Sequence, residues 1–218
     1  MTETLSLRAK IEQSPMGAYQ WMIVVMAAIM NLLDGFDVLA LAFTATAIRG
    51  EFGLSGIELG YLLSAGLFGM TAGSLFLAPL ADKIGRRPLL LMAVSLSAIG
   101  MLGSAFISQY QWLGFWRVIT GLGVGGILVG TNVITSEYSS RKWRSFAISV
   151  YAAGFGIGAV LGGMFAVMLQ GEYGWRSVFL AGAILTGLLL VVLFIWLPES
   201  IDFLTSKQPK NAEVRLNL

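Results

Sequence analysis

Six long apolar stretches, separated by short polar loops, constrain what this 218-residue chain can fold into. They run over residues 20–43, 59–80, 89–107, 112–136, 146–169 and 178–197. A helix needs roughly 20 apolar residues to cross the hydrocarbon core of a bilayer, whereas a barrel strand is about half as long and alternates in polarity. Hydrophobic residues make up 56% of the chain and charged residues only 12%, which is typical of a polytopic membrane protein. The sequence therefore predicts an all-α bundle of six transmembrane helices.

The stretches also divide the chain. We expect a polar N-terminal tail over residues 1–19, a transmembrane bundle over 20–197, and the start of a polar loop over 198–218. The first stretch is too long, and too polar at its centre, for a cleaved signal sequence. The short loops leave no room for a soluble domain, so one helical bundle in contact with lipid is predicted.

Orientation follows from the distribution of lysine and arginine. The tail, the second-to-third loop, the fourth-to-fifth loop and the C-terminal segment fall on one side, and only Arg49 and Arg176 fall on the other. The first group contains Arg8, Lys10, Lys83, Arg86, Arg87, Arg141, Lys142, Arg144, Lys207, Lys210 and Arg215. Since basic residues concentrate on the cytoplasmic side of membrane proteins, both termini are predicted to be cytoplasmic. The net charge of +2 reflects this topology and does not indicate a nucleic-acid partner.

The composition argues against an enzyme and against a cofactor. The chain has no cysteine and no histidine, so disulfides and the usual transition-metal ligands are missing. It shows no arrangement of nucleophile and base. The glycine-rich run at residues 121–126 lies inside an apolar stretch and is not followed by lysine, so it does not resemble a phosphate-binding loop.

Two carboxylates interrupt the first stretch. Asn31, Asp34 and Asp37 succeed one another in steps of three residues, about 60° around a helix, so they share a face. Ionisable residues at bilayer depth are costly and usually mark a pathway for substrate or protons. Burial and mutual repulsion disfavour two adjacent anions, so Asp34 or Asp37 is expected to carry a proton. The structural alternative is that the pair caps a kink at Gly35 or holds a neighbouring helix.

A single arginine interrupts the fourth stretch. Arg117 lies about as deep from the outer side as Asp37, so the two side chains are predicted to approach each other. A helical wheel places Arg117, Gly121, Leu128, Thr131 and Thr135 on one face, which suits the wall of an aqueous cavity. The guanidinium is expected to neutralise an aspartate or bind a carboxylate substrate in bidentate fashion. Asn31, Arg117 and Thr131 are the candidate substrate-binding residues, and a static Arg117–aspartate tie is the structural alternative.

Glycine recurs at helical spacing within three of the stretches, where it would let helix backbones approach closely. These glycines are Gly66, Gly69 and Gly73; Gly121 and Gly125; and Gly154, Gly158 and Gly162.

The loop between the second and third stretches carries a family resemblance. Residues 78–88 read APLADKIGRRP, which resembles the signature loop of the major facilitator superfamily, Gly-x-x-x-Asp-(Arg/Lys)-x-Gly-Arg-(Arg/Lys), with alanine at the first glycine. The matching positions are Asp82, Lys83, Gly85, Arg86 and Arg87. In that superfamily the loop gates the cytoplasmic side through ion pairs that are remade between states. The alternative is that these bases are ordinary cytoplasmic anchors.

Three further segments support the resemblance. The pattern from Arg117 to Gly125 resembles the fourth span of the superfamily, and residues 197–204 resemble the segment that leaves its sixth span. Glu137, with Arg144 after it, resembles the charged end of the fourth span, where an acid pairs with the bases of the signature loop. The resemblance therefore adds Glu137 and Arg144 to the gating group.

Within the superfamily, the run from Asp34 to Asp37 is most similar to the aromatic acid:proton symporters. That resemblance implies proton-coupled uptake of a small organic anion, in a bacterial inner membrane, with alternating access. Superfamily members have twelve spans in two halves with substrate bound between them, so this chain resembles the N-terminal half. The missing C-terminal half, or a second chain, would be its partner. The alternatives are a sugar or polyol carrier of the same superfamily, and a six-span remnant that regulates another carrier.

Overall fold

The computed structural model describes residues 15–207, of which six helices are long and apolar enough to cross a membrane. These are α2 (Ala18–Phe52), α3 (Gly56–Ile84), α4 (Arg86–Ala105), α5 (Tyr110–Tyr138), α6 (Arg144–Tyr173) and α7 (Trp175–Trp196). A short helix α8 (Ile201–Lys207) follows them. The predicted all-α membrane bundle is confirmed. Much of the predicted tail and central loop, including Arg8, Lys10, Lys210 and Arg215, lies outside the described residues.

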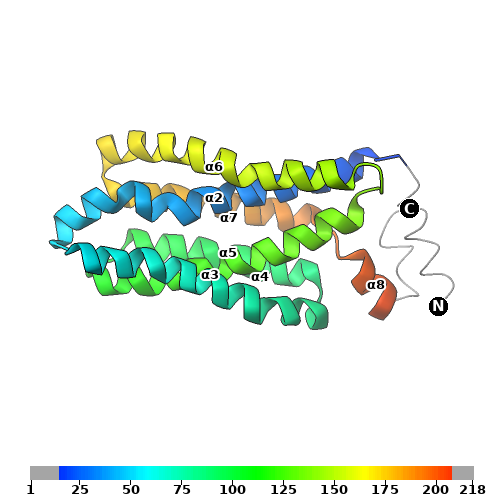
Figure 1. Cartoon of the computed structure of the whole chain (residues 1–218), viewed down its shortest axis with the longest axis horizontal. Helices are drawn as coiled ribbons and strands as arrows, with labels where there is room; N and C mark the ends of the chain where they lie inside the picture. Colours follow the sequence, from blue (N-terminus) through cyan, green and yellow to red (C-terminus); the bar gives the residue numbers. More distant parts are fainter. Residues whose placement is uncertain (1–14, 208–218) are drawn as a thin grey trace.

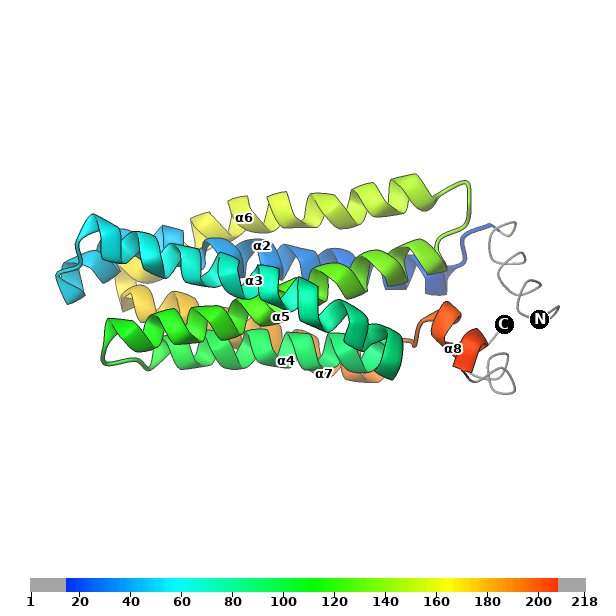
Figure 2. The ribbon, with the colours of Figure 1, turned by 60° about the horizontal axis from the view of Figure 1, so that its bottom comes forward.

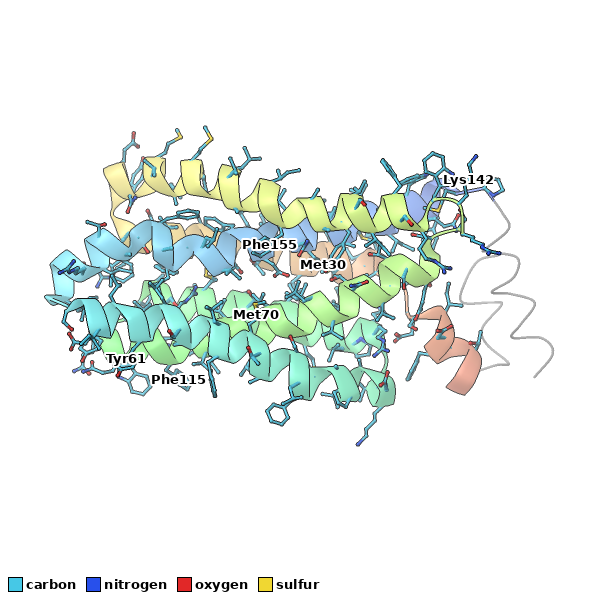
Figure 3. The ribbon with its side chains drawn as sticks, in the orientation of Figure 1. Met30, Tyr61, Met70, Phe115, Lys142 and Phe155 are labelled. Atoms are coloured by element: carbon cyan, nitrogen blue, oxygen red, sulfur yellow. The ribbon has the colours of Figure 1, made fainter. Side chains whose placement is uncertain are left out.

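The helices run side by side along the long axis of the molecule (Figure 1). The α3–α4 loop, the α5–α6 loop and α8 lie at one end, and the α2–α3, α4–α5 and α6–α7 connections lie at the other. Lys142 is seen at the end that carries α8 (Figure 3). Within the described part of the chain, the basic loops that the sequence grouped together therefore share one end of the bundle, while Arg49 and Arg176 lie at the opposite end.

Several helices extend well past the apolar stretches. The first was expected to end near residue 43, but α2 continues through Arg49 to Phe52 and ends where Gly53 adopts a left-handed conformation, with φ at 63°. A polar helical turn can continue beyond the hydrocarbon because its backbone hydrogen bonds are internal. The α3 helix begins with a capping box in which Ser55 and Glu58 each bond the main chain of the other.

Two helix pairs form the closest contacts, α3 with α5 and α2 with α6 (Figure 2). A β-carbon on Gly158 of α6 would overlap the main-chain carbonyl of Leu32 on α2. A β-carbon on Gly69 of α3 would likewise overlap the carbonyl of Val118 on α5. The predicted role of these glycines in close packing is thus observed, because the backbones touch where side chains are absent.

The faces of α3 and α6 turned away from these contacts are apolar and exposed. In the apolar 18-residue segment of α3, and likewise of α6, only 17% is buried, against 61% for the corresponding segments of α2 and α5. The large exposed side chains include Tyr61, Phe68 and Phe76 on α3, and Val160, Met164 and Met168 on α6. The α2 and α5 helices therefore form the interior of the bundle, and they bear the buried charged residues Asp34, Asp37 and Arg117.

Candidate functional site

Asp37 lies at the junction of α2, α4 and α5. Its side chain is 1% exposed, and its Oδ2 accepts a hydrogen bond of 2.7 Å from the hydroxyl of Ser97 on α4. The other carboxylate oxygen, Oδ1, has no hydrogen-bond donor within the described chain. Space around it is limited by Gly182 of α7, where a β-carbon would approach Oδ1 to 3.3 Å. The carboxylate is thus held toward α4 and α7.

Arg117 reaches the same junction from α5 and is 3% exposed. Its Nη1 donates to the main-chain carbonyl of Asp37 at 3.2 Å, so the predicted approach to Asp37 occurs through the backbone and not through the carboxylate. Its Nη2 donates to Met101 Sδ, Ser104 Oγ and Thr120 Oγ1 at 2.9, 3.3 and 2.9 Å. The guanidinium lies 4.8 Å from the ring centroid of Phe179.

The groups that accept hydrogen bonds from the Arg117 guanidinium are all neutral. An isolated charge in a low-dielectric interior is strongly unfavourable unless an opposite charge compensates it. Arg117 contacts the main chain of Asp37, so Asp37 is the acid placed to balance the guanidinium charge. The junction therefore combines one guanidinium and one carboxylate without a direct ion pair between them.

Asp34 and Asn31 lie near the middle of α2, on the side of α5 and α6. Asp34 is 2% exposed and Asn31 is 3% exposed. The amide nitrogen of Asn31 donates to the main-chain carbonyl of Tyr151 on α6 at 2.9 Å. Asp34 Oδ2 and Asn31 Oδ1 have no donor within residues 15–207. Phe155 of α6 is seen at this mid-length level (Figure 3), and its main-chain carbonyl lies against Gly35 of α2.

Thr131 is fully buried on α5 and faces α6. Its hydroxyl donates to the main-chain carbonyl of Ile127 on its own helix, and its Oγ1 lies 3.2 Å from Tyr151 Oη, within hydrogen-bond distance. Tyr151 also interacts electrostatically with Asp34. Thr131, a candidate substrate ligand from the sequence, is thereby placed in one polar group with Asn31, Asp34 and Tyr151.

A pocket opens between α2, α3 and α5 beside this group. Asp37 and Val38 line it from α2, Gly66 and Met70 from α3, and Arg117, Thr120 and Gly121 from α5. Asn31, Asp34 and Thr131 do not line it. The residues predicted from the sequence therefore fall into two groups. Asp37 and Arg117 line the pocket, and Asn31, Asp34 and Thr131 lie on the side of α6.

Ser97, Met101, Thr120 and Tyr151 were missed by sequence reasoning. A serine, methionine, threonine or tyrosine in an apolar span is common and carries no charge to mark it. Only the packing of α4 and α6 against α2 and α5 brings these side chains to the charged residues. The helical phase of Thr120, three residues after Arg117, was the one available signal.

The signature loop forms a tight connection at the end of the bundle that carries α8. Asp82 and Arg86, four residues apart, form an ion pair of 2.7 Å. Gly85 between them has a φ of 103°, and it joins the last turn of α3, which contains Lys83, to α4. Arg87 Nη2 donates to the carbonyl of Phe194 at the end of α7, at 2.7 Å.

Glu199 binds the main chain of this loop. Glu199 Oε1 accepts from the main-chain nitrogens of Arg86 and Arg87 at 2.7 and 3.0 Å, which caps the start of α4. Glu137 accepts from Ser200 Oγ at 3.0 Å and from the main-chain nitrogen of Ile201 at 2.9 Å. Glu137 therefore caps α8, a helix that the sequence did not predict, and its expected pairing with the bases of the loop stays a prediction.

Arg144, the last of the expected gating residues, begins α6 at the same end of the bundle.

The fold and its charged interior define a six-helix membrane bundle of the kind that secondary transporters build in halves. The sequence model of the Major Facilitator Superfamily matches residues 27–215, and the chain belongs to this family, whose members transport solutes across membranes and are not enzymes. Its helices correspond to the N-terminal half of the superfamily fold.

Sequence relatives include transporters of aromatic acids. The chain is 36% identical to a gallate transporter of Pseudomonas putida, an alignment that covers 94% of this chain and 45% of that protein. It is 34% identical to the 4-hydroxybenzoate transporter PcaK of Pseudomonas putida, over 99% of this chain and 48% of PcaK. The chain thus spans about half the length of the relatives it matches.

A solved structure has the same fold. The proton:xylose symporter XylE superposes with a TM-score of 0.84 at 23% identity, over 93% of this chain and 50% of XylE.

Proposed function

We propose that the chain is one half of a proton-coupled importer of small aromatic carboxylates that works by alternating access. The observation that carries this proposal is the burial of Asp34, Asp37 and Arg117 in the bundle interior, with the two acids near the middle of α2 and Arg117 about two turns into α5. Ionisable side chains at this depth are costly and serve substrate or proton movement in most membrane proteins. The names of the gallate and 4-hydroxybenzoate relatives support the substrate class.

Each group has a separate task in this mechanism. Arg117 lines the pocket and keeps Nε without an acceptor, so it offers a donor to an arriving carboxylate. Asp34 and Asp37 provide oxygens that lack donors and can take up a proton from the outer side. A second six-helix half completes the cavity, with α3 and α6 exposing the apolar faces that it would cover.

The signature loop acts as the inward gate in this proposal. Asp82, Arg86 and Glu199 join α3, α4 and the segment after α7, at the end that the positive-inside rule assigns to the cytoplasm. Breaking or remaking these contacts would couple movement of the helices to opening of the pocket on that side. We place both termini in the cytoplasm and the protein in a bacterial inner membrane.

The test is uptake of labelled 4-hydroxybenzoate, benzoate and, as a neutral control, xylose, with and without an inward proton gradient. Cells would express either the 218-residue chain or the longest reading frame that contains it. Gradient-dependent uptake of the acids by the longer product alone is the expected result. Uptake of xylose instead would assign a sugar carrier. Uptake of none of these solutes by either product would discard the aromatic-acid assignment and favour a regulatory six-span protein.

A further inference from the structure

Asp34 and Asp37 are in different hydrogen-bonding environments although they lie one turn apart. Asp37 Oδ2 accepts from the Ser97 hydroxyl at 2.7 Å, and the guanidinium of Arg117 lies against its main chain. Asp34 Oδ2 is buried with no donor among the described residues. A carboxylate anion is stabilised by donated hydrogen bonds and by a nearby cation. Asp37 has both, although its Oδ1, like Asp34 Oδ2, has no donor among the described residues. The two acids therefore differ in the Ser97 hydroxyl and the Arg117 guanidinium that lie at Asp37.

Asn31 is fixed in one orientation. Its amide nitrogen donates to the carbonyl of Tyr151 at 2.9 Å and lies 3.5 Å from the carbonyl of Ala152, both on α6. The amide oxygen of Asn31 must therefore point away from those carbonyls. It is buried without a donor among the described residues, which is unfavourable for a polar atom.

Asn31 and Asp34 are neighbours on one helix face. Residues three apart in a helix have β-carbons about 5–6 Å from each other, within reach of a side-chain hydrogen bond. Asn31 Oδ1 and Asp34 Oδ2 are both acceptors without a donor. One hydrogen placed on the Asp34 carboxyl supplies a donor to the Asn31 oxygen and removes the charge of Asp34.

Charge balance also distinguishes Asp34 from Asp37. Arg117 and Asp37 together are neutral, so a second anion at Asp34 would be an uncompensated charge in the bundle interior. The titratable groups that face Asp34 are Tyr151 from α6 and Asp37 from its own helix, with Arg117 of α5 beyond Asp37. The α4 and α7 helices carry charged side chains only at their ends.

We propose, building on the proton-coupled function above, that Asp34 carries the coupled proton, that Asn31 positions it as its hydrogen-bond acceptor, and that Asp37 stays the anion that balances Arg117. Asn31 is thereby a positioning residue and not a substrate ligand. Arg117, which lines the pocket, is left to meet the carboxylate of the substrate.

Infrared difference spectroscopy tests this division without requiring transport. The purified chain in lipid vesicles is taken between neutral and alkaline pH, a range in which exposed carboxylates stay ionised, and the carbonyl stretch of the carboxyl groups that remain protonated is recorded. Asp34→Asn should lose the band and Asp37→Asn should keep it. Asn31→Leu, of similar size but without the acceptor, should keep the band and move it to higher frequency, because the carboxyl loses its hydrogen bond.

Thr44→Val is the matched control. Thr44 is a fully buried polar residue on the same helix, but its hydroxyl bonds only main-chain carbonyls of α2. This substitution should leave the band in place. The proposal is overturned if Asp37→Asn removes the band or if Asn31→Leu leaves its frequency unchanged. The measurement on Asn31→Leu requires only that this variant folds, and circular dichroism checks its folding.

Transport separates this inference from the proposed function. In vesicles containing the longest reading frame, Asp34→Asn should lose accumulation driven by a proton gradient while it still exchanges labelled acid for unlabelled acid. Asp37→Asn should lose both, since Arg117 is left without its counter-charge. If the unmutated protein moves no acid at all, the proposed function fails. If the unmutated protein accumulates acid and Asp34→Asn does so equally, only the inference fails.

Discussion

The carboxylate of Glu199 occupies the space into which a β-carbon on Gly85 would project. Gly85 also has a φ of 103°, a region that favours glycine. The loop can therefore form only with glycine at this position and with the Glu199 side chain laid across it. The two residues are more than a hundred positions apart in sequence, and their contact ties the start of α4 to the segment after α7.

Gly85→Ala is expected to destabilise the bundle because it combines backbone strain with displacement of Glu199. The cost should be about 1–3 kcal/mol for a strained backbone position. Thermal unfolding in detergent, followed by circular dichroism, measures it. Glu199→Gln should cost less, about 1 kcal/mol, since an amide oxygen still accepts from the α4 main chain but without the charge. Glu172→Gln on the exposed surface of α6 is the control, and an equal loss there would contradict the argument.

Arg117→Lys should reduce uptake of an aromatic acid by about tenfold or more, because one ammonium cannot replace the several donors of a guanidinium. The native side chain donates to a carbonyl of α2, to a thioether and a hydroxyl of α4, and to a hydroxyl of α5. Initial rates of uptake over a range of substrate concentrations provide the measurement. Retained uptake in Arg117→Gln would mean that the transported solute needs no cationic anchor, in line with a neutral sugar or polyol.

The six helices could be predicted because their apolar stretches exceed the thickness of a bilayer. Their ends could not, since hydropathy falls at Thr44 and Arg49 while the α2 backbone stays helical until Gly53. The short helix α8 was missed for a related reason. It is seven residues long, and its start is capped by Glu137 from α5, a contact that no local pattern encodes.

The charged part of the site could be predicted because intramembrane charges are rare. Asp34, Asp37 and Arg117 stood out for that reason, and all three are buried. Their division into two environments could not be predicted. It depends on Ser97 and Tyr151, which reach the site only through the packing of α4 on α5 and of α6 on α2. Likewise, Glu137 and Glu199 are equivalent as acids in the sequence, and tertiary structure decides which one binds the main chain of the signature loop.

Gly158→Ala should destabilise the α2–α6 contact. A β-carbon there would overlap main-chain atoms of Leu32, which cannot move aside as a flexible side chain would. Overpacking of this kind costs typically about 1–3 kcal/mol. Gly156→Ala is the matched control, since nothing lies within 4 Å of its β-carbon position, and better helix propensity should leave stability equal or slightly higher. Thermal unfolding of both variants in detergent is the measurement, and equal melting temperatures would contradict the packing argument.

At the end of the bundle opposite α8, Glu51 of α2 joins Arg176 of α7 through two hydrogen bonds of 2.7 and 2.9 Å. The Trp175 indole donates to the same carboxylate at 2.7 Å. Both charged side chains are about 40% exposed, so water and salt screen the pair, and its coupling should be about 0.5–1 kcal/mol. A double-mutant cycle of Glu51→Gln and Arg176→Gln, read from unfolding at low and high salt, measures it. Arg176 Nη2 also donates to the main-chain carbonyl of Ile107 at 3.1 Å, so the two single substitutions remove different sets of contacts and only the cycle isolates the pair. The coupling should shrink at high salt because salt screens exposed charges, and a coupling that is the same at low and high salt would contradict this account.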